Sequence, residues 1–333
     1  MTDAFLDIRN VSRRFVPRVT FGQKIAARLG QPVDARVTHA VDGVSLTIAR
    51  GEALGLVGES GCGKSTLGRV VAGILSPSEG TTAVAGEPVM ANGRKTTTRV
   101  QMIFQDPFAS LDPRMQVGDT IAEGPLAHRL TTKADAKDYV GRWLTTVGLD
   151  PAFAARYPHQ FSGGQRQRIA IARALAMQPD MLVCDEPVAS LDVSIQAQII
   201  NLFLKLRREL GLTMLFISHD LGVVRHLCDR VAIMYLGRIV ELGATDAVYA
   251  APQHPYTQAL LDSVPRLVLA DDVTTVFRPI AGELPSPLSP PPGCHFHLRC
   301  PLAFARCREE RPALREIGVG RLSACHLAPF PAA

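Results

Sequence analysis

The chain has 333 residues, of which 47% are hydrophobic and 20% charged, and its formal net charge is +5. This composition supports a packed core and excludes a wholly disordered chain, and the length suggests two domains, or one large domain with an extension. The basic residues are scattered, which argues against nucleic-acid binding. No apolar run is long enough to cross a bilayer, and Asp3 and Asp7 argue against a signal peptide. We therefore expect a cytosolic protein, or one docked on a membrane protein from the cytosolic side.

The first predicted element is a strand over Phe5–Phe15, interpreted as an edge strand from its alternating residues. Phe15 ends it, and its ring either stacks on an adenine base or belongs to the core at the strand end. Residues 16–39 predict an irregular inserted loop. A second strand is predicted over Ala40–Ile48.

The next segment, Gly58–Thr66, fits the phosphate-loop pattern G-x-x-x-x-G-K-[ST]. Glycines let the backbone curl so that several N–H groups point into one concavity that suits an anion. A short buried strand over Leu54–Val57 precedes the loop, and apolar residues at helical spacing follow it. A bound phosphate would therefore sit at a helix N-terminus, which makes a chance glycine-rich turn a poor alternative. Lys64 is expected to reach the β- and γ-phosphates, and the Ser65 hydroxyl to coordinate Mg²⁺. The predicted ATP-binding residues of the loop are Gly58, Glu59, Ser60, Gly61, Cys62, Gly63, Lys64, Ser65 and Thr66.

A helical lobe is predicted after the loop. A strand over Thr81–Val89 and a short buried strand over Val100–Phe104 come first, and Gln105 follows the second. Asp106–Pro113 is interpreted as a turn-rich loop. From residue 117 to about residue 176 apolar residues recur at helical spacing, so we expect a lobe of helices inserted into the sheet domain.

Within this lobe, the sequence FSGGQRQR begins a predicted helix that runs through Met177. Serine is a favoured N-cap, and the free N–H groups of a first helical turn suit an anion. On its own, this stretch would be an ordinary helix start. The residues concerned are Ser162, Gly163, Gly164 and Gln165.

The next predicted strand, Met181–Asp185, ends in an acid, and a second acid, Glu186, follows it directly. Acids at a strand end beside a phosphate loop form a Walker B arrangement. Asp185 is expected to hold Mg²⁺, usually through water, and Glu186 to polarise the attacking water. A helix cap is the alternative, but Pro187 and the phosphate loop in the same chain argue against it.

The SLD sequence at Ser190–Asp192 leads into a helix predicted over Ser194–Leu210. A buried strand over Thr213–Ile217 follows, and His219 lies just beyond it. A histidine at such a strand end can hydrogen-bond a γ-phosphate and the attacking water, and a role in the core is the alternative. A hairpin over Val231–Leu242 is expected to close the sheet domain.

The ordered set of motifs, from the phosphate loop through Gln105, SGGQ, the Walker B acids and SLD to His219, resembles the ATP-binding subunits of ABC transporters. The resemblance covers the chain from about Phe5 to Leu242. It implies an α/β fold with a RecA-like sheet core, an antiparallel β edge and an inserted helical subdomain at about residues 106–178. It also implies that two such domains pair head to tail and hold ATP between the phosphate loop of one and the SGGQ signature of the other.

The resemblance also implies residue roles. Phe15 is the adenine-stacking position, and Gln105 senses Mg²⁺ and the lytic water. Ser162–Gln165 reach the γ-phosphate held by the partner, and Asp192 belongs to a loop that crosses the dimer interface. The implied magnesium ligands are Ser65, Gln105 and Asp185. The expected catalytic residues are Glu186 as general base, His219 for positioning, Gln105, and Lys64 for charge neutralisation.

Longer segments narrow the resemblance to the ATPases of oligopeptide/dipeptide importers: Gln101–Met115, Cys184–Gln198 and Phe216–Glu241. The stretch HPYTQALLDSVP from His254 is similar to their C-terminal extension, so residues 1–253 are assigned to the ATP-binding domain and residues 254–333 to this extension. The chain looks more like the F-type subunit. This implies a D-type ATPase partner, two permeases and an extracytoplasmic binding protein, at the cytoplasmic face of the inner membrane. A homodimer stays open.

Four cysteines near the end, Cys294, Cys300, Cys307 and Cys325, are spaced C-x5-C-x6-C-x17-C. Four thiolates suit Zn²⁺ or an iron–sulfur cluster, but zinc sites more often contain paired knuckles that are missing here. The resemblance favours a structural [4Fe–4S] cluster. We expect these cysteines to belong to a small C-terminal Cys-rich domain, and free or oxidisable thiols are the alternative to the cluster.

From these motifs we expect an ATPase, with ATP and Mg²⁺ as cofactors, that powers the import of di- or oligopeptides. Glutathione and nickel chelates are the alternative substrates. The rival functions are a soluble ABC ATPase that acts on ribosomes or DNA, a non-catalytic binding module and an exporter subunit. The chain has one ATPase domain, no heptads and no fused membrane helices, which argues against the first and third, and intact Glu186 and His219 argue against the second.

Overall fold

The computed structural model describes residues 4–17, 36–263, 280 and 282–330. Its main sheet has eight strands, in the spatial order β13 (Arg315–Gly318), β14 (Arg321–Ser323), β12 (Arg238–Ala244), β11 (Arg230–Tyr235), β3 (Ala53–Val57), β10 (Thr213–Ser218), β9 (Met181–Asp185) and β8 (Val100–Ile103). A four-stranded antiparallel sheet has the order β2 (Thr38–Ala49), β1 (Ala4–Phe15), β4 (Glu79–Val84) and β5 (Glu87–Pro88). A small hairpin joins β6 (Met90–Ala91) and β7 (Arg94–Lys95).

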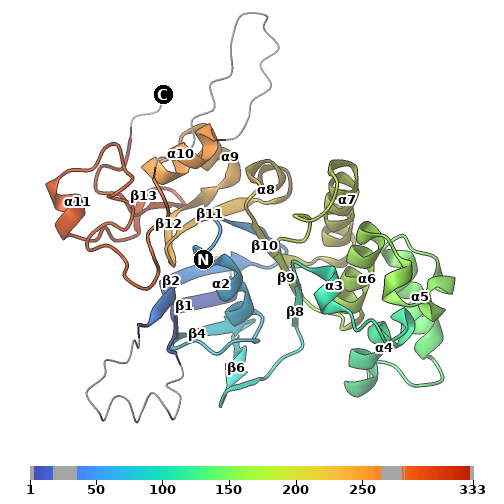
Figure 1. Cartoon of the computed structure of the whole chain (residues 1–333). Helices are drawn as coiled ribbons and strands as arrows, with labels where there is room; N and C mark the ends of the chain where they lie inside the picture. Colours follow the sequence, from blue (N-terminus) through green and yellow to red (C-terminus); the bar gives the residue numbers. More distant parts are fainter. Residues whose placement is uncertain (1–3, 18–35, 264–279, 281, 331–333) are drawn as a thin grey trace, which may run out of the picture.

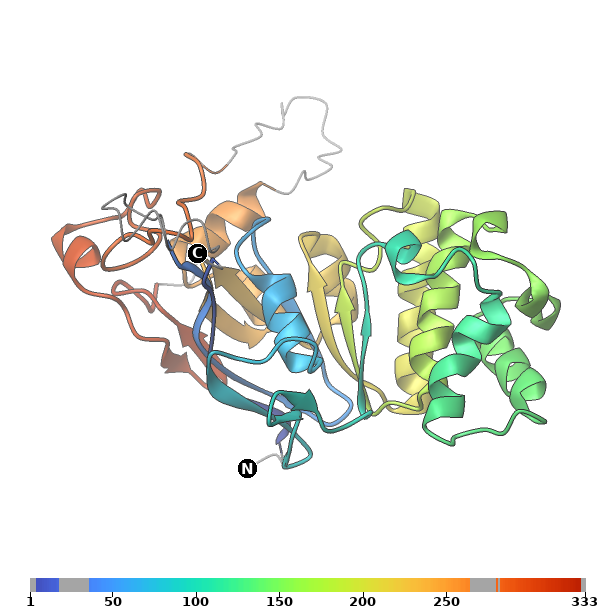
Figure 2. The ribbon, with the colours of Figure 1, turned by 60° about the horizontal axis from the view of Figure 1, so that its bottom comes forward.

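Helices surround the main sheet. Those outside the lobe are α2 (Lys64–Val71), α7 (Val193–Leu210), α8 (Leu221–Leu227), α9 (Thr245–Ala250), α10 (Pro255–Asp262) and α11 (Ala305–Glu309). The lobe contains α3 (Pro107–Ser110), α4 (Val117–Ala127), α5 (Ala136–Thr146), the 3₁₀ turns η1 (Pro151–Ala155) and η2 (Pro158–Gln160), and α6 (Gly163–Ala176). Figures 1 and 2 show this lobe at one end of the molecule and the C-terminal region at the other, with the main sheet between them.

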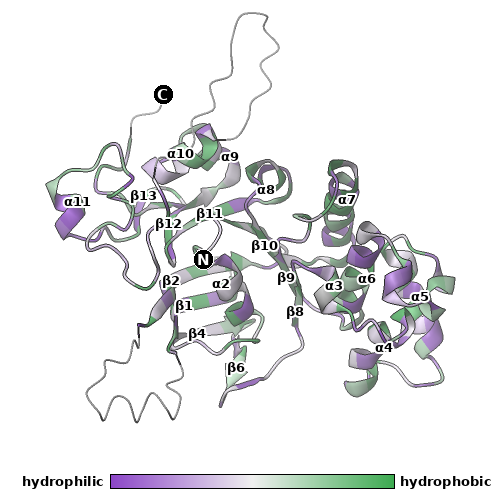
Figure 3. Cartoon of the chain, viewed as in Figure 1, coloured by the Kyte–Doolittle hydropathy of each residue, from purple (hydrophilic) through white to green (hydrophobic). Residues whose placement is uncertain are grey.

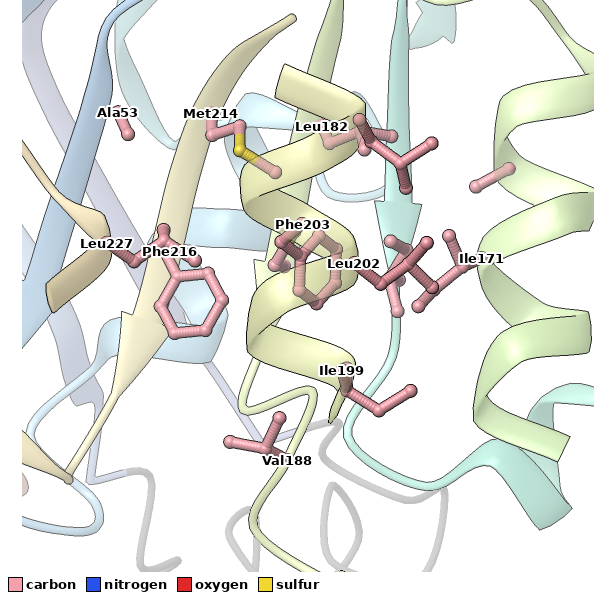
Figure 4. Packing of buried hydrophobic residues seen from close by; sticks show 14 of the residues in the cluster. Ala53, Ile171, Leu182, Val188, Ile199, Leu202, Phe203, Met214, Phe216 and Leu227 are labelled. Carbon is pink, nitrogen blue, oxygen red and sulfur yellow. The ribbon is translucent and has the colours of Figure 1, made fainter. Parts of the chain in front are cut away.

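The central parallel strands β3, β9 and β10 are buried on both faces, as expected for parallel strands. Along β10, Met214 and Phe216 belong to one hydrophobic core, whereas Leu215 and Ile217 belong to the other. The first core also contains Phe203 of α7 and continues into the lobe (Figure 4). The second core packs under α2 and the antiparallel sheet. The layers on both faces therefore hold in place the strands whose ends form the site.

The helices of the lobe are amphipathic. Figure 3 shows hydrophilic and hydrophobic bands alternating along α5. Its buried residues Tyr139, Val140 and Leu144 belong to the same core as Ile169 of α6. This confirms the prediction of an inserted helical lobe.

Three predictions about local structure are wrong. The first strand is not at an edge, because β1 pairs with both β2 and β4. Alternation reports which face of a strand is buried but not how many neighbours it has. The loop over residues 106–113 contains the short helix α3, capped by the Asp106 side chain. The second strand begins earlier than predicted, at Thr38, and residues 18–35 of the predicted inserted loop lie outside the described residues.

The hairpin of β11 and β12 does not close the sheet, which is the fourth difference from expectation. Strand β14 pairs with β12, with Leu322 opposite Leu242, and β13 then pairs with β14. Residues on both sides of the predicted boundary at residue 253 therefore share one sheet. The boundary itself stays a prediction.

Candidate functional site

The site lies where parallel strands end together. Val57 at the end of β3 is opposite Ser218 of β10, and Asp185 at the end of β9 is opposite Ile217. Ligands of open α/β sheets bind at this carboxyl edge. The phosphate loop, the two acids, Gln105 and His219 all follow strands at this edge.

The phosphate loop requires glycine at two positions. Gly63 has a φ of 108°, and a Cβ there would lie 2.0 Å from the carbonyl oxygen of Ala40. A Cβ on Gly58 would lie 2.2 Å from the carbonyl oxygen of Met234. Neither backbone oxygen can move without disturbing a strand end, so any side chain at these positions would open the loop.

Lys64 begins α2 and folds back over the loop. Its buried Nζ donates hydrogen bonds to the carbonyl oxygens of Gly58, at 2.7 Å, and Glu59, at 3.0 Å. The same atom lies 3.9 Å from a carboxylate oxygen of Glu186. The ammonium group is thus fixed over the anion nest, where it would meet a bound phosphate.

Oxygen ligands suited to Mg²⁺ lie beside the loop. The Ser65 hydroxyl donates to the Asp185 carboxylate at 2.7 Å. Burial raises the pKa of Asp185, and the Ser65 hydrogen bond opposes this effect. A hydroxyl and a carboxylate in contact fit the hard oxygen set that Mg²⁺ prefers, and Gln105 would complete it. When bound, Mg²⁺ would neutralise charge that develops on the phosphates.

Glu186 connects three strand ends. Its Oε2 accepts a hydrogen bond from Gln105 Nε2 at 3.1 Å and lies 3.2 Å from His219 Nδ1. Its backbone is in the left-handed region, with a φ of 46°, and its N–H donates to the Ile217 carbonyl at 3.0 Å. Such strained conformations persist where the surroundings impose them and are enriched at functional sites. The carboxylate, which follows β9, is therefore held in one place by side chains that follow β8 and β10.

A cavity of about 210 Å³ lies over the loop. Its lining residues are Thr38, Ala40, Ser60, Gly61, Gly63, Lys64, Ser65, Thr66, Gln105, Glu186 and Pro287. Sequence reasoning did not assign Thr38, Ala40 or Pro287 to the site, and no local signal marks them. Phe15 is exposed and pairs with Thr38, which lines the cavity, but Phe15 itself does not line it. Stacking on adenine stays a prediction.

The SGGQ residues are not part of this cavity. Ser162 caps α6, and its backbone and side chain exchange hydrogen bonds with Gln165 in a capping box. This confirms the predicted helix start. Asp192 occupies the N-cap position of α7, but its exposed carboxylate makes no capping hydrogen bond to a backbone N–H of the helix. The roles assigned to these residues at a dimer interface stay predictions.

The four C-terminal cysteines are free thiols in this structure. Cys307 and Cys325 are buried, and the N–H of Cys294 donates to the Cys307 carbonyl at 2.8 Å. Burial, and to a smaller extent the other three thiols, raises the pKa of Cys294 to about 11. Within the described ranges, no three His, Cys, Asp or Glu side chains are arranged to hold a metal ion. The Cys-rich domain and its cluster therefore stay predictions.

Known proteins resemble the chain over most of its length. A family profile described as "ABC transporter" matches residues 41–189, and one described as "Oligopeptide/dipeptide transporter, C-terminal region" matches residues 240–307. The oligopeptide transport ATP-binding protein AppF of Bacillus subtilis is 47% identical over 330 residues, which are 98% of each chain. OppF of Salmonella typhimurium, another oligopeptide transport ATP-binding protein, is 50% identical over 84% of this chain and 85% of its own.

Solved structures agree with the fold. The chain has a TM-score of 0.60 with cbiO1 from Clostridium perfringens, part of an ABC transporter complex, at 29% identity, covering 74% of this chain and 91% of that one. The TM-score is also 0.60 with a dimeric ATP-binding cassette in a post-hydrolysis state with ADP and phosphate, at 25% identity, covering 72% and 98% of the two chains. With the phosphate loop, Walker B acids and capped SGGQ helix in place, the chain belongs to the ABC ATPases, in the family of oligopeptide transport ATP-binding proteins.

Proposed function

We propose that this ATPase powers the import of di- or oligopeptides by coupling ATP binding and hydrolysis to a change in permease conformation. The observation that supports it most is the convergence of Lys64, Gln105, Glu186 and His219 at one sheet edge, in a chain of this family. Importers of glutathione or nickel chelates would use the same ATP site, so they are the alternative.

The chain's own groups account for the chemistry. Lys64 neutralises charge on the transferred phosphate, and Glu186 takes the proton of the attacking water. Gln105 and His219 hold the Glu186 carboxylate from either side, at 3.1 and 3.2 Å. General-base catalysis of this kind requires a positioned carboxylate rather than a mobile one.

A second ATPase subunit is proposed to complete each ATP site. The phosphate loop and the SGGQ helix belong to separate parts of the chain, and none of Ser162–Gln165 lines the cavity. A head-to-tail partner would supply these residues, with Asp192 at the interface. From the resemblance of its motifs to F-type subunits, the proposed partner is a D-type ATPase, and a homodimer is the alternative.

A groove between the main sheet and the lobe is proposed as the permease site. It has a volume of about 850 Å³ and is lined by groups from β8, α4 and α6 that include Gln101, Phe104, Thr120, Gly124 and Arg173. Phe104 lines the groove and the next residue, Gln105, touches Glu186. A permease helix seated there would therefore press on the strand end that holds the general base.

The location proposed for the chain is the cytoplasmic face of the cell membrane, attached through the permeases. None of the helices in the described part of the chain combines the length and the apolar character needed to cross a membrane. An extracytoplasmic binding protein would deliver the substrate to the permeases.

The four C-terminal cysteines are proposed to bind a structural [4Fe–4S] cluster. Support comes from the donor set of four thiols, although in the described part of the chain they are not arranged as a metal site. Zinc or free thiols are the alternatives. Anaerobic purification followed by iron, sulfide and zinc analysis tests it, with Cys300→Ser as the variant that should lose iron. Zinc without iron would contradict the cluster.

Co-purification tests the transporter assignment. A tagged Glu186→Gln chain, expressed in its native context, is extracted from membranes with mild detergent and MgATP, and its companions are identified by mass spectrometry. Two permeases and a second ATPase are expected. Ribosomal or DNA-bound companions without permeases would overturn the transport role.

A further inference from the structure

Two residues that follow residue 253, Tyr256 and Arg299, hydrogen-bond to the phosphate loop at Glu59. The Glu59 backbone N–H donates to the Tyr256 hydroxyl at 2.8 Å. Its carboxylate accepts two hydrogen bonds from the Arg299 guanidinium, at 2.6 and 2.9 Å. Both partners follow residue 253, whereas the loop belongs to the ATP-binding core.

Arg299 is well placed for this contact. Its side chain is only 4% exposed, and a bidentate guanidinium–carboxylate pair fixes both distance and direction. The backbone N–H of Arg299 donates to the Phe296 carbonyl at 2.9 Å. The Phe296 ring in turn packs on Tyr235 and Tyr256, with ring centroids 5.3 and 5.4 Å apart. The same aromatic cluster therefore positions both groups that hold Glu59.

The backbone of Glu59 in turn helps to position Lys64, the lysine expected to bind phosphate. The Glu59 carbonyl accepts a hydrogen bond from Lys64 Nζ at 3.0 Å and one from the Cys62 N–H at 3.3 Å. Tyr256 and Arg299 thus hold the residue whose carbonyl orients Lys64. A shift of Glu59 would move the ammonium group that meets the phosphate.

The negative charge of Glu59 gives its contact with Arg299 a second effect, on nucleotide binding. A carboxylate in a loop that cradles a polyanion repels it, unless a cation cancels its charge and holds it away. Glu59 is not among the residues that line the cavity, and its side chain is directed to Arg299 instead.

We propose that Arg299 is a positioning residue for ATP. It holds the Glu59 carboxylate away from the nucleotide and cancels its charge, so the C-terminal region sets the ATP affinity of the phosphate loop. Tyr256 assists by fixing the Glu59 backbone. This inference rests on the ATP site described above.

Calorimetric titration of the full chain with MgATP tests this role. Arg299→Ala should bind MgATP about tenfold more weakly, because an unpaired carboxylate then faces the phosphates. Adding Glu59→Gln to Arg299→Ala should recover most of that loss, and Arg299→Lys should lose less than Arg299→Ala. Tyr256→Phe, which removes only the hydroxyl, should weaken binding by less than Arg299→Ala.

Arg306→Ala is the matched control. Arg306 also makes a bidentate pair with a glutamate, Glu310, in the same region, but this pair is exposed and touches no part of the loop. The Arg306→Ala variant should bind MgATP with the affinity of the wild type. In the assembled transporter, Arg299→Ala should raise the KM for ATP and leave kcat within about twofold, because binding and not chemistry is weakened.

Three results would overturn the role of Arg299. They are wild-type affinity in Arg299→Ala, no recovery on adding Glu59→Gln, and an equal loss in Arg306→Ala. Thermal unfolding without nucleotide identifies a variant that has not folded. If Arg299→Ala does not fold, the MgATP affinity of Arg299→Lys is compared with that of the wild type instead. A wild-type chain that bound no MgATP would overturn the ATP site and this inference together.

Discussion

Glu186 contacts three other residues of the site. Its carboxylate touches Gln105, His219 and Lys64, which come from three different segments of the chain. Its left-handed backbone and the hydrogen bond to Ile217 leave the side chain little freedom. A group held in this way can accept a proton in one geometry, which general-base catalysis requires.

Replacing Glu186 by glutamine should separate binding from turnover. The amide keeps the size of the side chain but cannot take a proton, so turnover should fall at least about 100-fold while MgATP still binds. Phosphate release and calorimetric titration measure the two effects. Glu209→Gln, at an exposed residue near Lys205, is the control and should turn over normally. Normal turnover in Glu186→Gln would remove Glu186 from the mechanism.

Two glycines of the loop should differ in their tolerance of alanine. Both have positive φ, 80° at Gly61 and 108° at Gly63, so each substitution strains the backbone by about 1 kcal/mol or more. Only Gly63→Ala also drives a methyl group into the Ala40 carbonyl, since the space at Gly61 is open. MgATP titration should therefore show a much larger loss for Gly63→Ala. Equal losses would mean that the contact with Ala40 does not limit the loop.

At the scale of elements, helix α10 depends on a neutral histidine. The Nδ1 atom of His254 accepts from the Tyr256 N–H at 3.1 Å and caps the helix. Burial lowers the pKa of His254 to about 3. The unfolded chain takes up a proton near pH 6.5 and the folded chain does not, so the free energy of unfolding must fall as the pH drops through this range.

The variant His254→Asn tests this dependence, because asparagine is a good N-cap that does not titrate. Between about pH 7 and about pH 5, the wild type should lose about 2 kcal/mol more of its unfolding free energy than the variant. Urea denaturation at the two pH values gives the difference. His295, whose pKa burial lowers to about 4, should leave some pH dependence in the variant. Parallel pH profiles would show that His254 is not kept neutral.

The elements could be predicted from sequence to differing extents. Strands β9 and β10 were predicted to within a residue, because each is a bounded apolar run buried on both faces. The sequence did not predict the position of β1 inside its sheet, nor the strands β13 and β14. Pairing such as that of Leu322 with Leu242 joins distant segments, and three- or four-residue strands carry no periodic signal.

The same limit applies to the site. Lys64, Glu186 and His219 could be predicted because each belongs to a short motif next to a strand. Arg299 and Tyr256 could not, because their contacts with Glu59 join positions 240 and 197 residues apart. No local pattern encodes a contact of that kind.

For the whole molecule, the groove between sheet and lobe is our proposed site of contact with a permease. Ile74 lines the groove and is 47% exposed. Ile74→Glu places a charge where a permease helix would bury it, so the variant should bind MgATP normally but no longer sediment with permease-containing vesicles. Leu210→Glu is the matched control, because Leu210 is 43% exposed but does not line the groove. Unchanged sedimentation of Ile74→Glu would exclude this groove as the docking site.

Peptide uptake into proteoliposomes tests the proposed function most directly. The vesicles contain the permeases and both ATPase subunits, with the binding protein and labelled synthetic peptides outside and MgATP enclosed. Peptide should accumulate with the wild-type chain and not with Glu186→Gln, while both chains bind MgATP. ATP hydrolysis without peptide uptake, or equal uptake with the variant, would contradict an importer driven by this site.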